Sequence, residues 1–120
     1  MTRLLAAVAV ITGIALGSVQ AQLYPDRPIK LIVPFVPGSP VDVLARVVSQ
    51  QLGLRLGQTV IIENRPGAGT STGTKMVATA APDGYTLLMS GQSLTYLNLF
   101  YPDLGFEAVK TFAPVATLRA

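Results

Sequence analysis

The feature that most limits the fold of this chain is a repeated order of strand, glycine-rich loop and helix. Runs of β-branched and apolar residues at Ile29 to Phe35, Thr59 to Glu63 and Tyr85 to Ser90 are typical of strands buried on both faces. Segments with helical patterning separate these runs. Because strand, helix, strand connections are right-handed and join parallel strands, the order predicts an α/β fold with a mostly parallel sheet and flanking helices.

A first helix is expected between two capping signals. Ser39 is a suitable N-cap, Pro40 suits the first helical position, and Asp42 follows the serine by three residues, close to a capping box. Gly57 is expected to end the helix. The apolar stripe that we expect to face the sheet consists of Leu44, Val48 and Leu52, with Val47 beside it.

The remaining elements are predicted from weaker patterns. A second helix is expected to be capped by Thr70 or Ser71 and to end before the turn at residues 81–84. Leu94 to Tyr101 is compatible with a short helix. Thr111 to Leu118 is compatible with a further strand, and Pro34 limits or ends the first strand.

The first residues predict an export signal at residues 1–21. A short basic start, Met1 to Arg3, precedes the apolar run Leu4 to Leu16, and the small residues before Gln22 suit cleavage after Ala21. An uncleaved anchor is disfavoured because the apolar run is shorter than the ~20 residues of a membrane span. Residues 22–120 are then one domain in the periplasm.

Composition excludes several classes of function. Without residues 1–21 the chain keeps 8 basic and 6 acidic residues, a net charge of +2, and shows no basic stripe for nucleic acid. The sequence contains no cysteine and no histidine, which removes thiol catalysis, the commonest general base and the commonest zinc ligand. Serines therefore lack a histidine partner, and we predict a binding protein without metal or cofactor rather than an enzyme.

The stretch "NRPGAGTSTGTK", Asn64 to Lys75, comes close to two phosphate-binding signatures but matches neither. The dinucleotide fingerprint fails because Thr72 stands where its third glycine belongs and Gly73 comes one residue late. The P-loop fails because Thr74 separates Gly73 from Lys75.

Three polar loops are nevertheless expected to meet at one edge of the sheet, since parallel strands place the loops after their carboxyl ends together. These loops are Val36 to Ser39, Asn64 to Ser71 and Ser90 to Thr95. Glycine allows backbone N–H groups to approach a ligand, and a helix start adds partial positive charge, so an oxyanion is the expected guest. A carboxylate suits the loops better than a triphosphate because no lysine or metal-binding pair stands where polyphosphate needs one.

Several polar side chains near these loops have two interpretations. Asp42 either orients a ligand or serves the capping box, and Arg65 either steers an anion or pairs with Glu63. Side chains that could hydrogen-bond a polar ligand are Gln92, Ser93 and Thr95. Lys75 is expected at the surface, and among the tyrosines Tyr96 is the one expected nearest the third loop.

The chain resembles the solute-binding proteins of tripartite tricarboxylate transporters, also called Bug receptors. The resemblance runs from Tyr24 to about Val115 and rests on the following segments in order: "YPDRPIKLIVPFVPGSPVDVLARVVSQQL", "GQTVIIENRPGAGTSTGT", "AAPDGYTLLMS" and "FAPV". It implies a periplasmic binding protein, type II-like, with two α/β lobes that close over a small carboxylate-bearing solute. Family members are longer, so residues 22–120 are expected to be an incomplete first lobe that ends before the second lobe begins.

The resemblance also implies the binding residues. In the family, backbone amides and bound waters of the first two loops hold a ligand carboxylate, and the third loop faces the same cleft. The corresponding positions here are Pro37, Gly38, Ser39, Asp42, Gly67, Ala68, Gly69, Thr70, Gly91, Gln92 and Ser93. The family usually has glycine at Ser39 and Thr70, so both loops carry a side chain where bare backbone is typical.

The leading hypothesis is a monomeric receptor that captures an organic acid and passes it to a membrane permease of one large and one small subunit. This chain alone is expected to bind weakly or not at all, because one face of the ligand stays wet. A receptor that signals through a sensor kinase is the second hypothesis. A secreted nucleotide-dependent enzyme is the third, and the broken signatures disfavour it.

Overall fold

The computed structural model describes residues 23–118, so the predicted signal peptide at residues 1–21 and its cleavage after Ala21 lie outside the described part. The elements are β1 (Ile29–Val33), α1 (Pro40–Leu56), β2 (Val60–Asn64), the 3-10 turn η1 (Ala68–Thr70), α2 (Ser71–Ala78), β3 (Thr86–Leu88), α3 (Ser93–Phe100) and α4 (Ala108–Thr111). No helix in this part is both long and apolar enough to cross a membrane.

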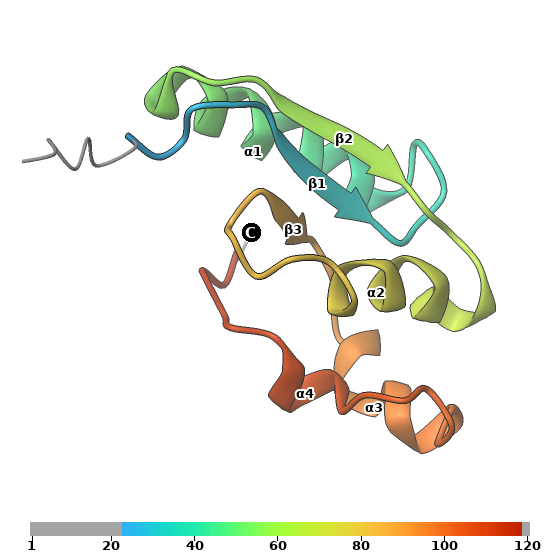
Figure 1. Ribbon diagram of the computed structural model, residues 1–120. Coiled ribbons are helices and arrows are strands. Elements are labelled where there is room, and N and C mark those ends of the chain that lie inside the picture. Colours follow the sequence, from blue (N-terminus) through green and yellow to red (C-terminus); the bar gives the residue numbers. More distant parts are fainter. Residues whose placement is uncertain (1–22, 119–120) are drawn as a thin grey trace, which may run out of the picture.

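The described strands form a three-stranded parallel sheet in the order β2-β1-β3, which confirms the predicted α/β class. Ile29 lies opposite Val60, and Lys30 lies opposite Thr86. The chain crosses from β1 outward to β2 and then back past β1 to β3. Right-handed crossovers in opposite directions place α1 and α2 on opposite faces of the sheet (Figure 1).

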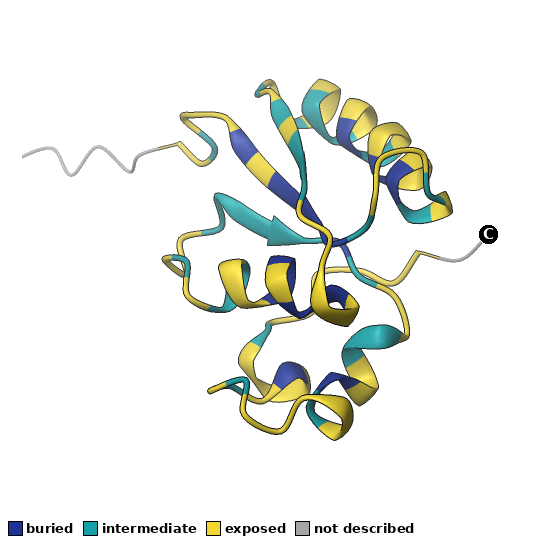
Figure 2. Ribbon diagram, turned by 90° about the vertical axis from the view of Figure 1, so that its right-hand side faces the viewer, coloured by how far each residue is buried: buried dark blue, intermediate teal, exposed yellow. Residues whose placement is uncertain are grey.

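The core lies between the sheet and α1. Leu31, Val33, Ala45 and Met89 form a buried cluster, and the remaining β1 residues except Lys30 are also buried (Figure 2). β1 is buried on both faces because it is the central strand and has a helix on either side. Pro34 directly follows β1, as predicted, since proline cannot donate to the ladder.

The predicted apolar stripe of α1 is wrong in part. Leu44 and Val47 are 41% and 56% exposed, whereas Asp42, Ala45 and Ser49 are the buried residues of the helix. Asp42 turns inward to accept hydrogen bonds, and positions three and seven residues later therefore face the sheet with it. A polar anchor, not the longest apolar row, sets the rotation of this helix.

The predicted strand at Thr111 to Leu118 is also wrong. Residues 112–118 have no regular structure, and Thr111 ends α4. Asn98 of α3 accepts a hydrogen bond from Ala108 N at 2.6 Å and donates to Phe106 O at 2.7 Å. This asparagine holds the start of α4, which takes in only Thr111 of the predicted strand.

Residues 24–27, which precede β1, form hydrogen bonds with the turn before β3. Tyr24 Oη donates to Gly84 O at 2.6 Å, and Tyr85 Oη donates to Asp26 Oδ1 at 2.6 Å. Arg27 lies over the Tyr85 ring at 4.1 Å from its centroid. These contacts lie at the amino-terminal edge of the sheet, opposite the three loops.

Candidate ligand-binding site

The loops predicted from the sequence leave the carboxyl-terminal edge of the sheet around the end of β1. Arg65 N donates to Val33 O at 2.8 Å, and Met89 N donates to Ile32 O at 2.9 Å. The chains that leave β2 and β3 therefore flank the end of β1 on its two sides. This is the edge at which open parallel sheets bind ligands.

The first loop is a tight turn that ends in the cap of α1. Gly38 has φ of +83°, a conformation that favours glycine. Asp42 N donates to Ser39 Oγ at 3.2 Å, which confirms Ser39 as the N-cap. The Asp42 carboxylate accepts from Gly38 N at 2.9 Å instead of from Ser39 N, so the capping box is displaced by one residue.

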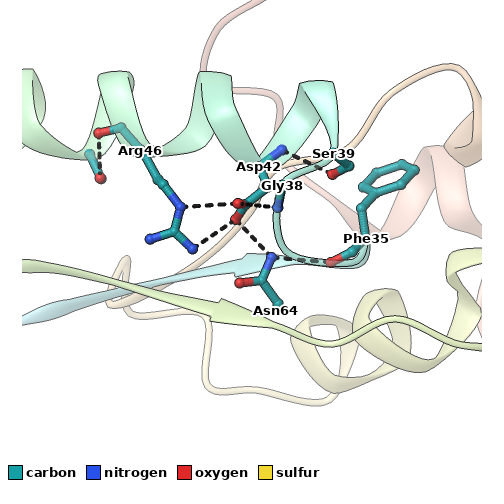
Figure 3. Close-up of polar contacts among 7 residues, drawn as sticks. Phe35, Gly38, Ser39, Asp42, Arg46 and Asn64 are labelled. Atoms are coloured by element: carbon teal, nitrogen blue, oxygen red, sulfur yellow. Dashed lines mark hydrogen bonds and ion pairs between the residues drawn. The ribbon is translucent and has the colours of Figure 1, made fainter.

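Asp42 is the centre of a buried polar network (Figure 3). Its side chain is 1% exposed and also accepts from Arg46 Nε at 3.0 Å and from Asn64 Nδ2 at 2.8 Å. The hydrogen bond from Gly38 N, followed by those from Asn64 and Arg46, lowers the pKa of Asp42 to about 2. The carboxylate is therefore ionised at neutral pH and fully occupied by donors of this chain.

Asn64 joins the first two loops. Its Nδ2 donates both to Asp42 Oδ1 and to Phe35 O, the latter at 3.1 Å. Asn64 ends β2, and Phe35 begins the loop after β1. One amide group thus fixes the separation of the two loops.

The second loop contains a continuous run of left-handed residues, Gly67 to Thr70. Their φ angles are +130°, +44°, +59° and +80° in order. Such angles are strained for Ala68 and Thr70, which carry a Cβ. Thr70 occupies the N-cap of α2 without a side-chain cap bond, so the predicted capping by Thr70 or Ser71 is not made by this side chain.

The second and third loops touch through two hydroxyl groups. Thr70 Oγ1 donates to Ser93 Oγ at 3.4 Å, and Thr70 is buried. The third loop is otherwise open: Gly91 and Gln92 are exposed, and their carbonyls accept from the first turn of α3. Ser90 Oγ is buried without a hydrogen-bond partner in the described part of the chain.

The family of the chain follows from a match to a known protein family. The profile of the tripartite tricarboxylate transporter family receptor, TctC, matches residues 44–120. This chain belongs to the TctC family.

Curated and solved TctC relatives agree with this assignment. Protein BugT of Bordetella pertussis is 44% identical over 122 residues, an alignment that covers 97% of this chain and 37% of BugT. The chain spans about a third of the length of the curated relatives that it matches.

The solved relatives share the fold. The periplasmic binding protein BugD is 48% identical with a TM-score of 0.53, covering 54% of this chain and 22% of BugD. MatC of Rhodopseudomonas palustris, solved with bound malate, is 36% identical with a TM-score of 0.65, covering 77% of this chain and 32% of MatC. Rpa4515 of R. palustris, solved with adipate, is 37% identical with a TM-score of 0.53, covering 54% and 22%.

The two positions at which the resemblance implies a family glycine, Ser39 and Thr70, differ in conformation. Ser39 has φ of −66°, which any residue adopts, and its hydroxyl caps α1. Thr70 has φ of +80°, so this chain keeps the conformation of a glycine with a β-branched residue in it. The strain therefore belongs to the second loop and not to the first.

Gly73, the glycine that came one residue late for the dinucleotide fingerprint, has a packing role. A Cβ there would lie 2.8 Å from Arg65 O and 2.9 Å from Pro34 Cβ. Its absence lets α2 lie directly on the end of β1. The position of Gly73, which does not fit the dinucleotide fingerprint, thus allows close contact between α2 and β1.

The remaining sequence candidates lie outside the network around the loops. Arg65 pairs with Glu63 at 3.0 Å, as its second interpretation predicted, and this contact and Lys30 lower the pKa of Glu63. Lys75 is exposed on α2, as expected. The Tyr96 ring packs edge-on against Phe100.

Arg46 and Asn64 also belong to the site, and the loop pattern does not predict either of them. For Asn64, an amide side chain at the end of a strand and at the start of a candidate loop is a usable signal. Arg46 follows Asp42 by four residues, the spacing of a helical ion pair. Among residues 23–118, no group of three acidic side chains gathers as a metal site would require.

Proposed function

We propose that this TctC chain forms one wall of the ligand cleft of a periplasmic receptor for small carboxylate-bearing solutes. The observation that carries the proposal is the left-handed run Gly67 to Thr70 at the carboxyl-terminal edge of the sheet. Successive backbone N–H groups in turn conformations of this kind make concavities that bind anions. The malate in MatC and the adipate in Rpa4515 support a carboxylate as the anion.

The proposed binding residues are Pro37, Gly38, Ser39, Gly67, Ala68, Gly69, Thr70, Gly91, Gln92 and Ser93. Asp42 belongs to the same set as a positioning residue, because its carboxylate accepts hydrogen bonds from Gly38 N and Asn64 Nδ2 and so fixes both loops. Every arginine near the loops is paired with an acid of this chain. Recognition by backbone N–H groups of the second loop and by hydroxyls therefore fits the site better than recognition by a cation, whereas Gly38 N and Ser39 N already donate within the first loop.

The cellular role is proposed from the family. The receptor acts as a monomer in the periplasm after cleavage behind Ala21, binds its solute without catalysis and passes it to a permease of one large and one small subunit. The matching family description and the periplasmic relative BugD support this role. Mass spectrometry of the exported chain tests the cleavage site, and a permease gene pair next to its gene would support transport over a sensor kinase.

The binding proposal is tested on the full chain, exported with its own amino-terminal segment and purified from the periplasm. Nitrogen-15 NMR spectra are recorded during titration with malate, with adipate and with the diamide of malate as the uncharged control. We expect shifts confined to the amides of the three loops, and a millimolar dissociation constant because a single wall leaves the other side of the ligand wet. The diamide should cause no such shifts.

Two results would count against the proposal. If neither acid shifts the amide signals of the loops, the proposed carboxylate site is rejected. Micromolar binding by this chain would show that one wall is sufficient and would remove the expectation of weak binding.

A further inference from the structure

Tyr101 ends α3 beside the second loop, a place that the sequence did not indicate. Its backbone N donates to Leu97 O at 2.9 Å and so closes the last turn of the helix. The start of the same helix touches the second loop through Ser93 and Thr70. Both ends of α3 therefore lie against the left-handed run.

The Tyr101 ring lies directly against Gly69. A Cβ built on Gly69 would be 2.8 Å from Tyr101 Oη, 3.0 Å from its Cε2 and 3.3 Å from its Cζ. Gly69 therefore must lack a side chain for two reasons, its φ of +59° and the ring beside it. Of the Tyr101 atoms, the phenol oxygen lies nearest to that position.

This hydroxyl is available to a ligand. Tyr101 is 37% exposed, and among residues 23–118 its hydroxyl makes no hydrogen bond. A tyrosine hydroxyl is both donor and acceptor and usually has a partner where it is half-buried. Arg46 and Arg65 are paired with Asp42 and Glu63.

We propose that Tyr101 is a ligand-contact residue, whose hydroxyl donates a hydrogen bond to a carboxylate oxygen of the solute held by Gly67 to Thr70. This inference rests on the proposed carboxylate site and adds a side-chain donor to a wall otherwise made of backbone amides and small hydroxyls. Tyr101 also forms the border of the proposed site on the side of α3. Its neutral hydroxyl favours acids that can place a carboxylate oxygen within hydrogen-bond distance.

The test compares Tyr101→Phe with the unchanged chain in the malate titration described above. The variant keeps the ring against Gly69 and removes one oxygen, so folding and packing are retained. We expect the dissociation constant for malate to rise roughly tenfold, the value of one hydrogen bond to a charged group. Tyr96→Phe is the matched control, since it removes a hydroxyl from the same helix, and its affinity should be unchanged.

The tyrosine 13Cζ resonance of Tyr101 provides a second measurement. Its signal should shift on addition of malate in the unchanged chain and should not shift with the diamide. If malate shifts the loop amides but Tyr101→Phe binds as tightly as the unchanged chain, the role of Tyr101 is overturned and the carboxylate site stands. If malate does not bind to the unchanged chain, both proposals fail together.

Discussion

Thr70 is the residue at which sequence and conformation conflict most directly. Its φ of +80° belongs to glycine, yet it carries a β-branched side chain that is buried. Three hydrogen bonds hold it there: its hydroxyl donates to Ser93 Oγ, its carbonyl accepts from Thr74 Oγ1 at 2.8 Å, and its backbone N donates to Gly67 O at 3.0 Å. The local strain is therefore offset by ties to the third loop and to α2.

Substitution of Thr70 should reverse the usual order of alanine and glycine. A left-handed residue with a Cβ costs roughly 1–2 kcal/mol, which exceeds the entropy cost of glycine. Thr70→Gly should therefore be more stable than Thr70→Ala by about 1 kcal/mol. Urea denaturation of the two variants measures the difference.

Thr72 is the matched control because it is an exposed threonine two residues later, inside α2. At Thr72 alanine should be more stable than glycine by about 1 kcal/mol, the ordinary helical preference. The same order at both positions would contradict the left-handed strain at Thr70.

At the scale of elements, the three strands of the sheet and both caps of α1 could be predicted because their signals are local. The β-branched runs, the Ser39 cap and the Gly57 stop depend on neighbours along the chain, and all three were confirmed. The rotation of α1 and the helical turn at Ala108 could not be predicted in this way. Each depends on one long-range amide, Asn64 or Asn98, whose partner the sequence does not identify.

The site shows the same division. Convergence of the loops follows from a parallel sheet, so the loops were predictable with the fold. The contact of Tyr101 with Gly69 was not, because the direction of α3 across the second loop depends on tertiary packing. Tyr96, which directly follows the third loop, packs its ring against Phe100.

The packing of α2 on β1 should be sensitive to one methyl group. Gly73→Ala adds a Cβ against Arg65 O and Pro34, neither of which is the end of a flexible side chain. The clash should destabilise the chain by about 1–3 kcal/mol, and should outweigh the ~1 kcal/mol that alanine gains in a helix. Thermal or urea unfolding measures this loss.

Gly91→Ala supplies the comparison, since a Cβ there meets nothing within 4 Å. Its stability should change by less than ~0.5 kcal/mol. Equal effects of the two substitutions would show that close approach at Gly73 does not hold α2 in place.

For the molecule as a whole, the described chain leaves several large apolar side chains exposed on α3, α4 and the segment after them. Leu99, Phe100, Val109 and Val115 are between 67% and 85% exposed. Their burial contributes little to stability, so the core between the sheet and α1 carries most of it. Because the net free energy of unfolding is small, polar interactions such as the Asp42 network contribute a large share of it.

The dependence of stability on pH should report that network. Asp42 and Glu63 both have lowered pKa values in the folded chain, about 2 for Asp42, so the unfolded chain binds protons more readily than the folded one. The stability that they contribute is complete above the ordinary carboxyl pKa of about 4 and is lost as the pH falls toward 2.

Asp42→Asn isolates the share of Asp42 in this loss. The variant should be less stable than the unchanged chain at pH 7, and the two free energies of unfolding should converge as the pH falls from about 4 to 2. Asp103→Asn, at an exposed aspartate after α3, is the control and should leave the stability at pH 7 unchanged. Urea titrations across this range decide the matter: a constant gap between Asp42→Asn and the unchanged chain would mean that the Asp42 carboxylate does not hold the first two loops through its charge.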